Sequence, residues 1–82
     1  MENRIKVLIA DGSEAFCGHL KNELQQLDGY DLVGTAADGE EAVRLLEATK
    51  PDILVLDLML AKRDGISVLR YANAMDKPPV GL

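Results

Sequence analysis

The sequence predicts an α/β domain with a doubly wound parallel sheet whose two faces are both covered by helices. Two observations predict this class. Short apolar runs alternate with segments in which apolar residues recur every three or four positions, as they do on one face of a helix. The runs at 5–10 and 52–59 are also nearly continuous in their hydrophobicity, which is typical of parallel strands buried on both faces.

The composition limits what this chain can do. Its 82 residues make one domain at most, and a hydrophobic content of 48% argues against disorder. The net charge of −5 argues against direct binding of nucleic acid, because surfaces that bind it are strongly basic. Cys17 is the only cysteine, so we expect no internal disulfide and a cytoplasmic location. No apolar run is long enough for a membrane span, and we expect no membrane partner.

The first strand and the first helix are predicted over residues 5–29. Residues 5–10 form the strand. Ser13 is the expected N-cap of the helix, since its hydroxyl can accept a backbone hydrogen bond from the first turn. Gly29 is expected to end the helix in a left-handed C-cap. The apolar face of this helix consists of Phe16, Leu20, Leu24 and Leu27.

A second strand and a second helix follow. Residues 30–36 form the strand, and residues 38–50 form the helix. Asp38 and Glu41 have the spacing of a capping box, with Asp in place of the usual Ser or Thr. Pro51 cannot continue the helix, because its backbone lacks the N–H that the helix needs. The inward face is predicted at Ala42, Leu45 and Leu46.

The last elements are a third strand at 52–59, a third helix at 65–75 and the start of a fourth strand at Val80. The third helix is expected to turn Ile66, Leu69 and either Ala72 or Asn73 inward. Because the fourth strand has only begun, we expect an edge of unpaired backbone groups. Such an edge favours pairing with a second copy, as a homodimer or a swapped oligomer.

Two of the predicted strands end in a carboxylate. Asp11 follows the first strand and Asp57 interrupts the apolar run of the third. Neighbouring strands lie about 4.8 Å apart, so the two carboxylates would face each other and repel unless a cation intervenes. Mg²⁺ suits an oxygen site of this kind. The alternative is that each Asp merely caps the loop that follows it, and two Asp at equivalent strand ends favour the cation site.

At this point the residues resemble a known family. "IKVLIAD" and "GTAADGEEAVRLLEATKPDILVLDLMLAKRDG", with the spacing between them, are similar to the receiver domain of bacterial two-component response regulators. The resemblance implies a flavodoxin-like (CheY-like) doubly wound parallel sheet, truncated after the start of strand four, with residues 1–82 as an incomplete receiver. Within the family, "IKVLIAD" and "LVGTAADGEEA" resemble the sporulation transcription regulator of endospore-forming bacteria.

The resemblance implies a role for each matching residue. Asp57 corresponds to the phosphoacceptor, which takes phosphate from a histidine kinase or a phosphotransfer protein. Asp11, Asp57 and the backbone carbonyl of Met59 correspond to the Mg²⁺ ligands. Asp64 and Gly65 correspond to the turn before the third helix. The family implies a signalling module and not an enzyme, with DNA bound only through an effector domain beyond Leu82.

Three departures from the family pattern stand out. Gly12 occupies the position where receivers usually carry a second acidic residue, so Mg²⁺ binding is expected to be weakened, and Glu14 is a candidate substitute. Ala61 replaces a proline that is usual after the methionine region. The Ser or Thr that ends strand four of receivers, and the Lys that ends strand five, would both lie beyond Leu82.

Other functions were weighed against phosphotransfer. A degenerate receiver, acting as a phosphorylation-independent protein-interaction module, is favoured by Gly12 and opposed by Asp57. A dinucleotide-binding fold lacks its glycine-rich turn, and a phosphohydrolase lacks the second Asp that it needs after the nucleophile. Lys62 and Arg63 lie close enough to Asp57 in sequence to touch phosphate, but solvated loop residues are the better interpretation.

Overall fold

The alternation of strands and helices predicted from the sequence is confirmed. The structure is a computed structural model that describes residues 4–60 and 65–82. Its elements are β1 (Ile5–Ala10), α1 (Glu14–Gln25), β2 (Tyr30–Ala36), α2 (Gly39–Thr49), β3 (Ile53–Leu56), α3 (Gly65–Asn73) and β4 (Val80–Gly81). None of the helices in the described ranges has the length and hydrophobicity needed to cross a bilayer.

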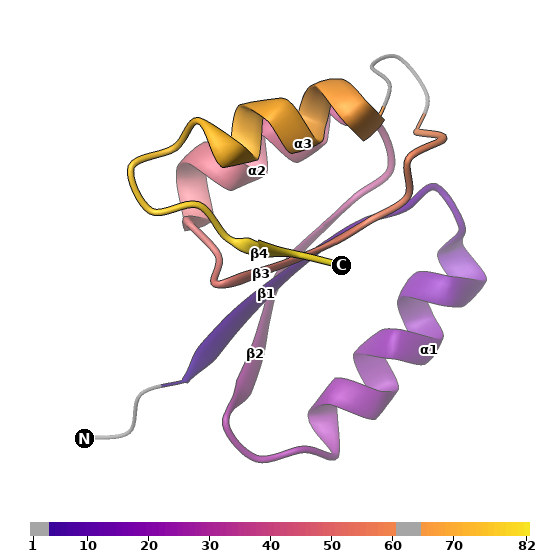
Figure 1. The fold of residues 1–82 in the computed structure, drawn as a ribbon. Coiled ribbons are helices and arrows are strands. Elements are labelled where there is room, and N and C mark those ends of the chain that lie inside the picture. The colour runs from indigo at the N-terminus through magenta and orange to yellow at the C-terminus, as the bar shows by residue number, and fades with distance from the viewer. Residues whose placement is uncertain (1–3, 61–64) are drawn as a thin grey trace.

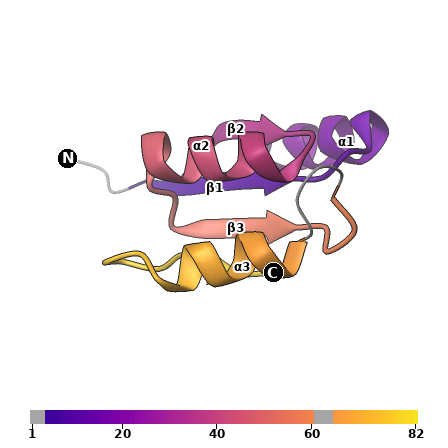
Figure 2. The same cartoon turned by 90° about the horizontal axis from the view of Figure 1, so that it is seen from above.

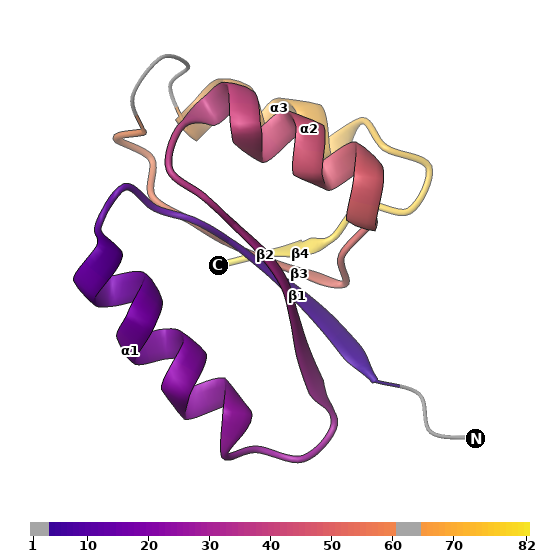
Figure 3. The ribbon, with the colours of Figure 1, turned by 180° about the vertical axis from the view of Figure 1, so that it is seen from behind.

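The strands form one parallel sheet in the order β2-β1-β3-β4. The chain therefore moves outward from β1 to β2, returns past β1 to β3 and continues to β4. Helices α2 and α3 lie side by side on one face of the sheet, and α1 lies on the other (Figure 1; Figure 3). Seen from above, the strands run in one direction between these layers (Figure 2). This is the doubly wound, flavodoxin-like arrangement that the sequence predicts.

The core lies between the sheet and the pair α2 and α3. Leu8 of β1 and Leu54 of β3 point to this side and are fully buried. They pack in one cluster with Leu46 of α2 and with Val68 and Ala72 of α3. Because side chains alternate between the faces of a strand, Val7 and Ile9 point to the opposite side, toward α1, and they too are buried. Both faces of β1 are therefore apolar and covered.

The face that carries α1 is covered less completely. No residue of α1 is fully buried. Phe16 is 41% exposed and Leu27 is 53% exposed, so the predicted apolar face of this helix is only partly buried. The physical reason is that, among the described residues, α1 is the one helix on this face, and it packs mainly against β2.

The ends of two elements differ from the predictions. Helix α1 ends at Gln25, and Gly29 does not cap it. Gly29 does adopt a positive φ of 91°, but it lies in the turn before β2, where its carbonyl accepts the Ile5 N–H at 2.7 Å. The third strand was predicted at 52–59 but spans only Ile53–Leu56. Asp57 therefore lies just outside the strand.

The prediction that Ile66 faces inward is wrong. Ile66 is 53% exposed, whereas the buried positions of α3 are Gly65, Val68 and Ala72. Leu69 is half-buried, and Asn73, one of the two alternatives, is exposed. Helix α3 is oriented so that Gly65, which has no side chain, contacts the backbone just after β3. The side chain of the next residue, Ile66, therefore faces solvent.

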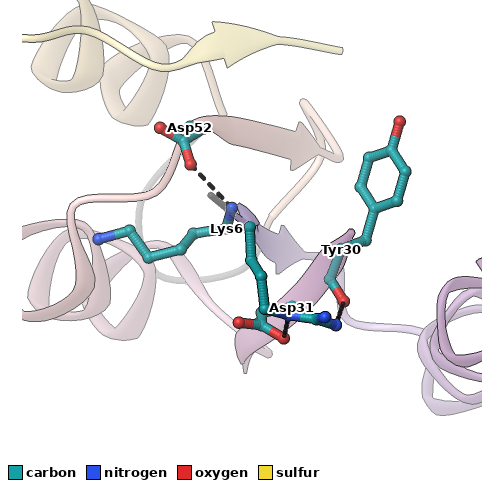
Figure 4. Close-up of polar contacts among 5 residues, drawn as sticks. Lys6, Tyr30, Asp31 and Asp52 are labelled. Atoms are coloured by element: carbon teal, nitrogen blue, oxygen red, sulfur yellow. Dashed lines mark hydrogen bonds and ion pairs between the residues drawn. The ribbon is translucent and has the colours of Figure 1, made fainter. Parts of the chain in front are cut away.

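Polar contacts at the amino ends of the strands hold the sheet in register. The Lys6 backbone N–H donates to Asp52 Oδ2 at 2.8 Å (Figure 4). Lys6 Nζ donates to the Thr49 carbonyl at 2.7 Å. That ammonium places a positive charge at the carboxyl end of α2, where the helix dipole favours it. Asp31 accepts a hydrogen bond from Arg4 Nε at 2.7 Å, which ties β1 to β2.

The caps of α1 and α2 follow the sequence closely. Ser13 Oγ accepts the Phe16 N–H, and Asp38 Oδ1 accepts the Glu41 N–H at 2.9 Å. The Glu41 carboxylate reaches back to the N–H of Ala37, one residue before the position that a standard capping box uses. The first turns of α1 and α2 are therefore fixed by side-chain hydrogen bonds.

Truncating the core should cost far more stability than truncating the exposed Leu27, in the turn after α1. We expect Leu46→Ala to lower the free energy of unfolding by about 2–5 kcal/mol, because it opens a cavity beside Leu8 and Val68. Leu27→Ala is the matched control, and its effect should be about 0.5 kcal/mol or less. Urea unfolding measures both, and equal losses would contradict the described core.

The outer edge of β4 gives a second prediction, on association. Val80 and Leu82 are 62% and 70% exposed, and within residues 4–60 and 65–82 β4 pairs on one side only, with β3. We expect a purified piece of residues 1–82 to form oligomers through this edge, because unpaired strand groups template pairing with another chain. Size-exclusion chromatography with light scattering measures the mass. A monomer with a sharp cooperative melt would overturn this expectation.

Candidate functional site

Asp11 and Asp57 occupy matching positions at the carboxyl edge of the sheet. In the pairing of β1 with β3, Ala10 lies opposite Leu56, and each Asp is the next residue along its chain. The Asp57 N–H donates to the Ala10 carbonyl at 2.8 Å, so the β1–β3 ladder continues into the site. The Asp11 N–H donates to the Ala36 carbonyl of β2 at 2.9 Å. Both residues are therefore fixed by the sheet although neither belongs to a strand.

Each carboxylate is also oriented by a backbone donor two residues on. The Ser13 N–H donates to Asp11 Oδ1 at 2.8 Å, and the Met59 N–H donates to Asp57 Oδ1 at 2.9 Å. These are the short local turns that Asp favours after a strand. A carboxylate can accept about four hydrogen bonds, so both groups keep acceptor capacity for a cation. The capping role and the ligand role are compatible here.

Gly12 departs from the family pattern, although the structure does not require glycine at this position. It lies exposed, and its φ is outside the left-handed region. A Cβ at this position would meet only the Ala37 carbonyl, at 3.5 Å, which is ordinary contact. The backbone would accept an acidic residue, so the chain lacks this carboxylate for no steric reason that the structure describes.

Glu14 is the candidate substitute for the missing carboxylate. It is the first residue of α1 and is exposed. In residues 4–60 and 65–82, no group of three or more His, Cys, Asp or Glu side chains gathers in a way that could hold a metal ion. The described oxygen donors at the strand ends are thus the two carboxylates and neighbouring carbonyls. Ala61, Lys62, Arg63 and Asp64 lie outside the described residues.

Cys17 lies beside the site, a contact that no pattern in the sequence indicates. Its Sγ donates to the Asp11 carbonyl at 3.4 Å. Burial raises the pKa of the Cys17 thiol, and the negative charges of Asp11 and Glu14 raise it further. The thiol therefore stays protonated and supports the Asp11 backbone, as expected of a structural cysteine and not of a nucleophile.

The comparisons with known proteins agree with this geometry. The family model of the response regulator receiver domain matches residues 7–81. This chain belongs to the response regulator receiver family.

This receiver is similar to a transcriptional regulatory protein and to a solved response regulator domain. It is 46% identical over 65 residues to the alkaline phosphatase synthesis transcriptional regulatory protein PhoP of Bacillus subtilis, covering 79% of this chain and 26% of PhoP. The crystal structure of the response regulator domain of Thermotoga maritima CheB has a TM-score of 0.82 at 32% identity, over 94% of this chain and 56% of that one. The chain spans about a quarter of PhoP's length.

A third relative was solved as a complex. The crystal structure described as the CheX–CheY–BeF₃–Mg²⁺ complex from Borrelia burgdorferi has a TM-score of 0.77 at 34% identity. The match covers 94% of this chain and 58% of that one. These likenesses establish the receiver fold for this chain.

Restoring the missing acidic residue should strengthen Mg²⁺ binding. We expect Gly12→Asp to tighten the Mg²⁺ dissociation constant by about tenfold, because the number of ligand charges tunes affinity for a hard cation. Gly18→Asp is the matched control: it adds the same charge on α1, where a Cβ meets nothing within 4 Å. Titration calorimetry measures both. If Gly12→Asp binds no more tightly than Gly18→Asp, then another group already fills the position.

Proposed function

We propose that this receiver accepts a phosphoryl group on the Asp57 carboxylate from a histidine kinase or a phosphotransfer protein. One observation carries the proposal. Asp57 follows the central strand β3 at the carboxyl edge of the sheet, in register with Asp11 after β1. Its peptide N–H donates a hydrogen bond to the Ala10 carbonyl. In open parallel sheets, ligands bind beyond the carboxyl ends of the strands at such a switch in strand order.

In this reaction the main contribution of the protein is to position the nucleophile. A carboxylate oxygen of Asp57 forms a bond to phosphorus, the P–N bond of the donor phosphohistidine breaks, and the imidazole leaves with the bonding electron pair and takes up a proton. The hydrogen bond from the Met59 N–H to Asp57 Oδ1 limits the rotation of the carboxylate. Such orientation lowers the entropic cost of attack.

The surroundings of Asp57 suit contact with a protein donor. Leu58 is 51% exposed and Met59 is 88% exposed, and they are the two residues that follow Asp57. A docked donor would cover these apolar side chains while it brings its phosphohistidine to the carboxylate. The same burial would exclude water from the site during transfer.

We propose Mg²⁺ as the cofactor, held by Asp11, Asp57 and the Met59 carbonyl and weakened by Gly12. Two carboxylates at neighbouring strand ends form a donor set of the kind that a hard divalent cation prefers. When bound, the cation offsets the negative charges of the carboxylates and the phosphoryl group. The Mg²⁺ named for the Borrelia burgdorferi complex supports this assignment.

We propose further that residues 1–82 are the receiver part of a cytoplasmic transcription regulator. PhoP, a transcriptional regulatory protein, supports that output, and sporulation is the process favoured by the opening segments. With a net charge of −5, this segment would leave DNA binding to an effector domain. The rival function is a degenerate receiver that binds partners without phosphorylation, and the observation that favours it is the glycine at position 12.

Phosphorylation should depend on the carboxylate that follows β3 and not on the one that precedes it. We expect the intact protein, incubated with a small acyl-phosphate donor and Mg²⁺, to gain one phosphoryl adduct by mass spectrometry. Asp57→Asn should abolish the adduct. Asp52→Asn, at the opposite end of β3, is the matched control and should keep it. An adduct that persists in Asp57→Asn would remove Asp57 as the acceptor, and no adduct in the unmodified protein would favour the degenerate receiver.

A further inference from the structure

We propose that Gly65 is a positioning residue for Asp57, because its lack of a side chain lets the first turn of α3 rest directly on the backbone of the phosphoacceptor. The inference rests on the proposed function of Asp57 and adds to it the device that holds Asp57 in place. Gly65 is the first residue of α3 and is buried.

The contact is one that only glycine permits. A Cβ on Gly65 would lie 2.3 Å from Leu58 Cα and 2.8 Å from the Asp57 carbonyl oxygen, both of them backbone atoms. The φ of Gly65 is outside the left-handed region, so the close approach and not the backbone conformation requires glycine here. By contrast, a Cβ on Gly18 would meet nothing within 4 Å.

The acceptor backbone is thereby held from two sides. On the sheet side, the Asp57 N–H donates to the Ala10 carbonyl at 2.8 Å. On the helix side, the Gly65 N–H donates to the Leu58 carbonyl at 3.0 Å. The Met59 N–H, which orients the Asp57 carboxylate, belongs to the same peptide group as that Leu58 carbonyl. Helix α3 therefore holds the peptide group whose N–H orients the Asp57 carboxylate.

If a methyl group is added to Gly65, the acceptor loop should move and the helix should not. Helix α3 is anchored by Val68 and Ala72, which are 0% and 1% exposed, and by a hydrogen bond from the Tyr71 hydroxyl to Glu47. Leu58 and Met59, which lie nearest the added methyl group, are 51% and 88% exposed, and the buried anchor of this loop, Leu60, comes after them. The displacement would therefore fall on the Met59 N–H and on the carboxylate that it orients.

The test compares Gly65→Ala with Gly18→Ala in the full-length protein. We expect Gly65→Ala to shift the Met59 amide resonance, to speed its hydrogen exchange, and to slow phosphorylation from a small acyl-phosphate donor on the order of tenfold to a hundredfold. The Leu8 amide should be unchanged. Gly18→Ala should leave both the Met59 amide and the rate as they are. A Gly65→Ala protein with an unchanged Met59 amide overturns the proposal.

Two further outcomes are informative. If Gly65→Ala is too unstable to study, the double variant Gly18→Ala/Gly65→Ala adds a better helix former in α1, and loss of folding in both assigns Gly65 to the fold and overturns the positioning role. If the unmodified protein takes no phosphate, the proposed function fails, and the Met59 amide, which needs no phosphate, still decides whether Gly65 positions the loop.

Discussion

The parallel pairing of β1 with β3 is the constraint on which the rest of this receiver depends. It places Ala10 opposite Leu56 and carries the ladder one hydrogen bond further, from the Asp57 N–H to the Ala10 carbonyl. Because β2 pairs on the other side of β1, the chain changes direction across the sheet at this point. The two carboxylates leave the sheet side by side at that change, and this placement is the basis of the proposed cation site.

The carboxylates of the site are oriented by backbone groups more than by other side chains. Backbone N–H groups of Ser13 and Met59 orient the carboxylates, and the Gly65 peptide closes the helix side. Such groups are held by the fold itself, so little has to be ordered when a ligand arrives. The contact at Gly65 also accounts for the rotation of α3, since the helix can approach the β3 end only with its glycine inward.

Local patterns predicted much of this arrangement. Ser13 and Asp38 cap their helices as their sequence positions suggest, and the strand-end aspartates were located from the apolar runs before them. The exposure of Phe16 and Ile66 could not be predicted, because helical periodicity gives the spacing of an apolar face and not what covers it. The left-handed φ of 47° at Lys50 likewise depends on how α2 turns into Pro51, which composition does not specify. The roles of Asp11, Asp57 and Met59 stay predictions.

The central claim is that the carboxylates of Asp11 and Asp57 form one cation site at the carboxyl edge of the sheet. Mn²⁺ tests it most directly, because it substitutes for Mg²⁺ at oxygen sites and broadens the NMR signals of nearby nuclei. Titrated into the ¹⁵N-labelled protein, Mn²⁺ should first broaden the amides of Asp11, Asp57 and Met59, and excess Mg²⁺ should restore them. The amides of Lys6 and Asp52, at the opposite end of the strands, should stay sharp. Broadening that begins at Lys6 and Asp52, or that spreads evenly over the acidic surface, would contradict the account.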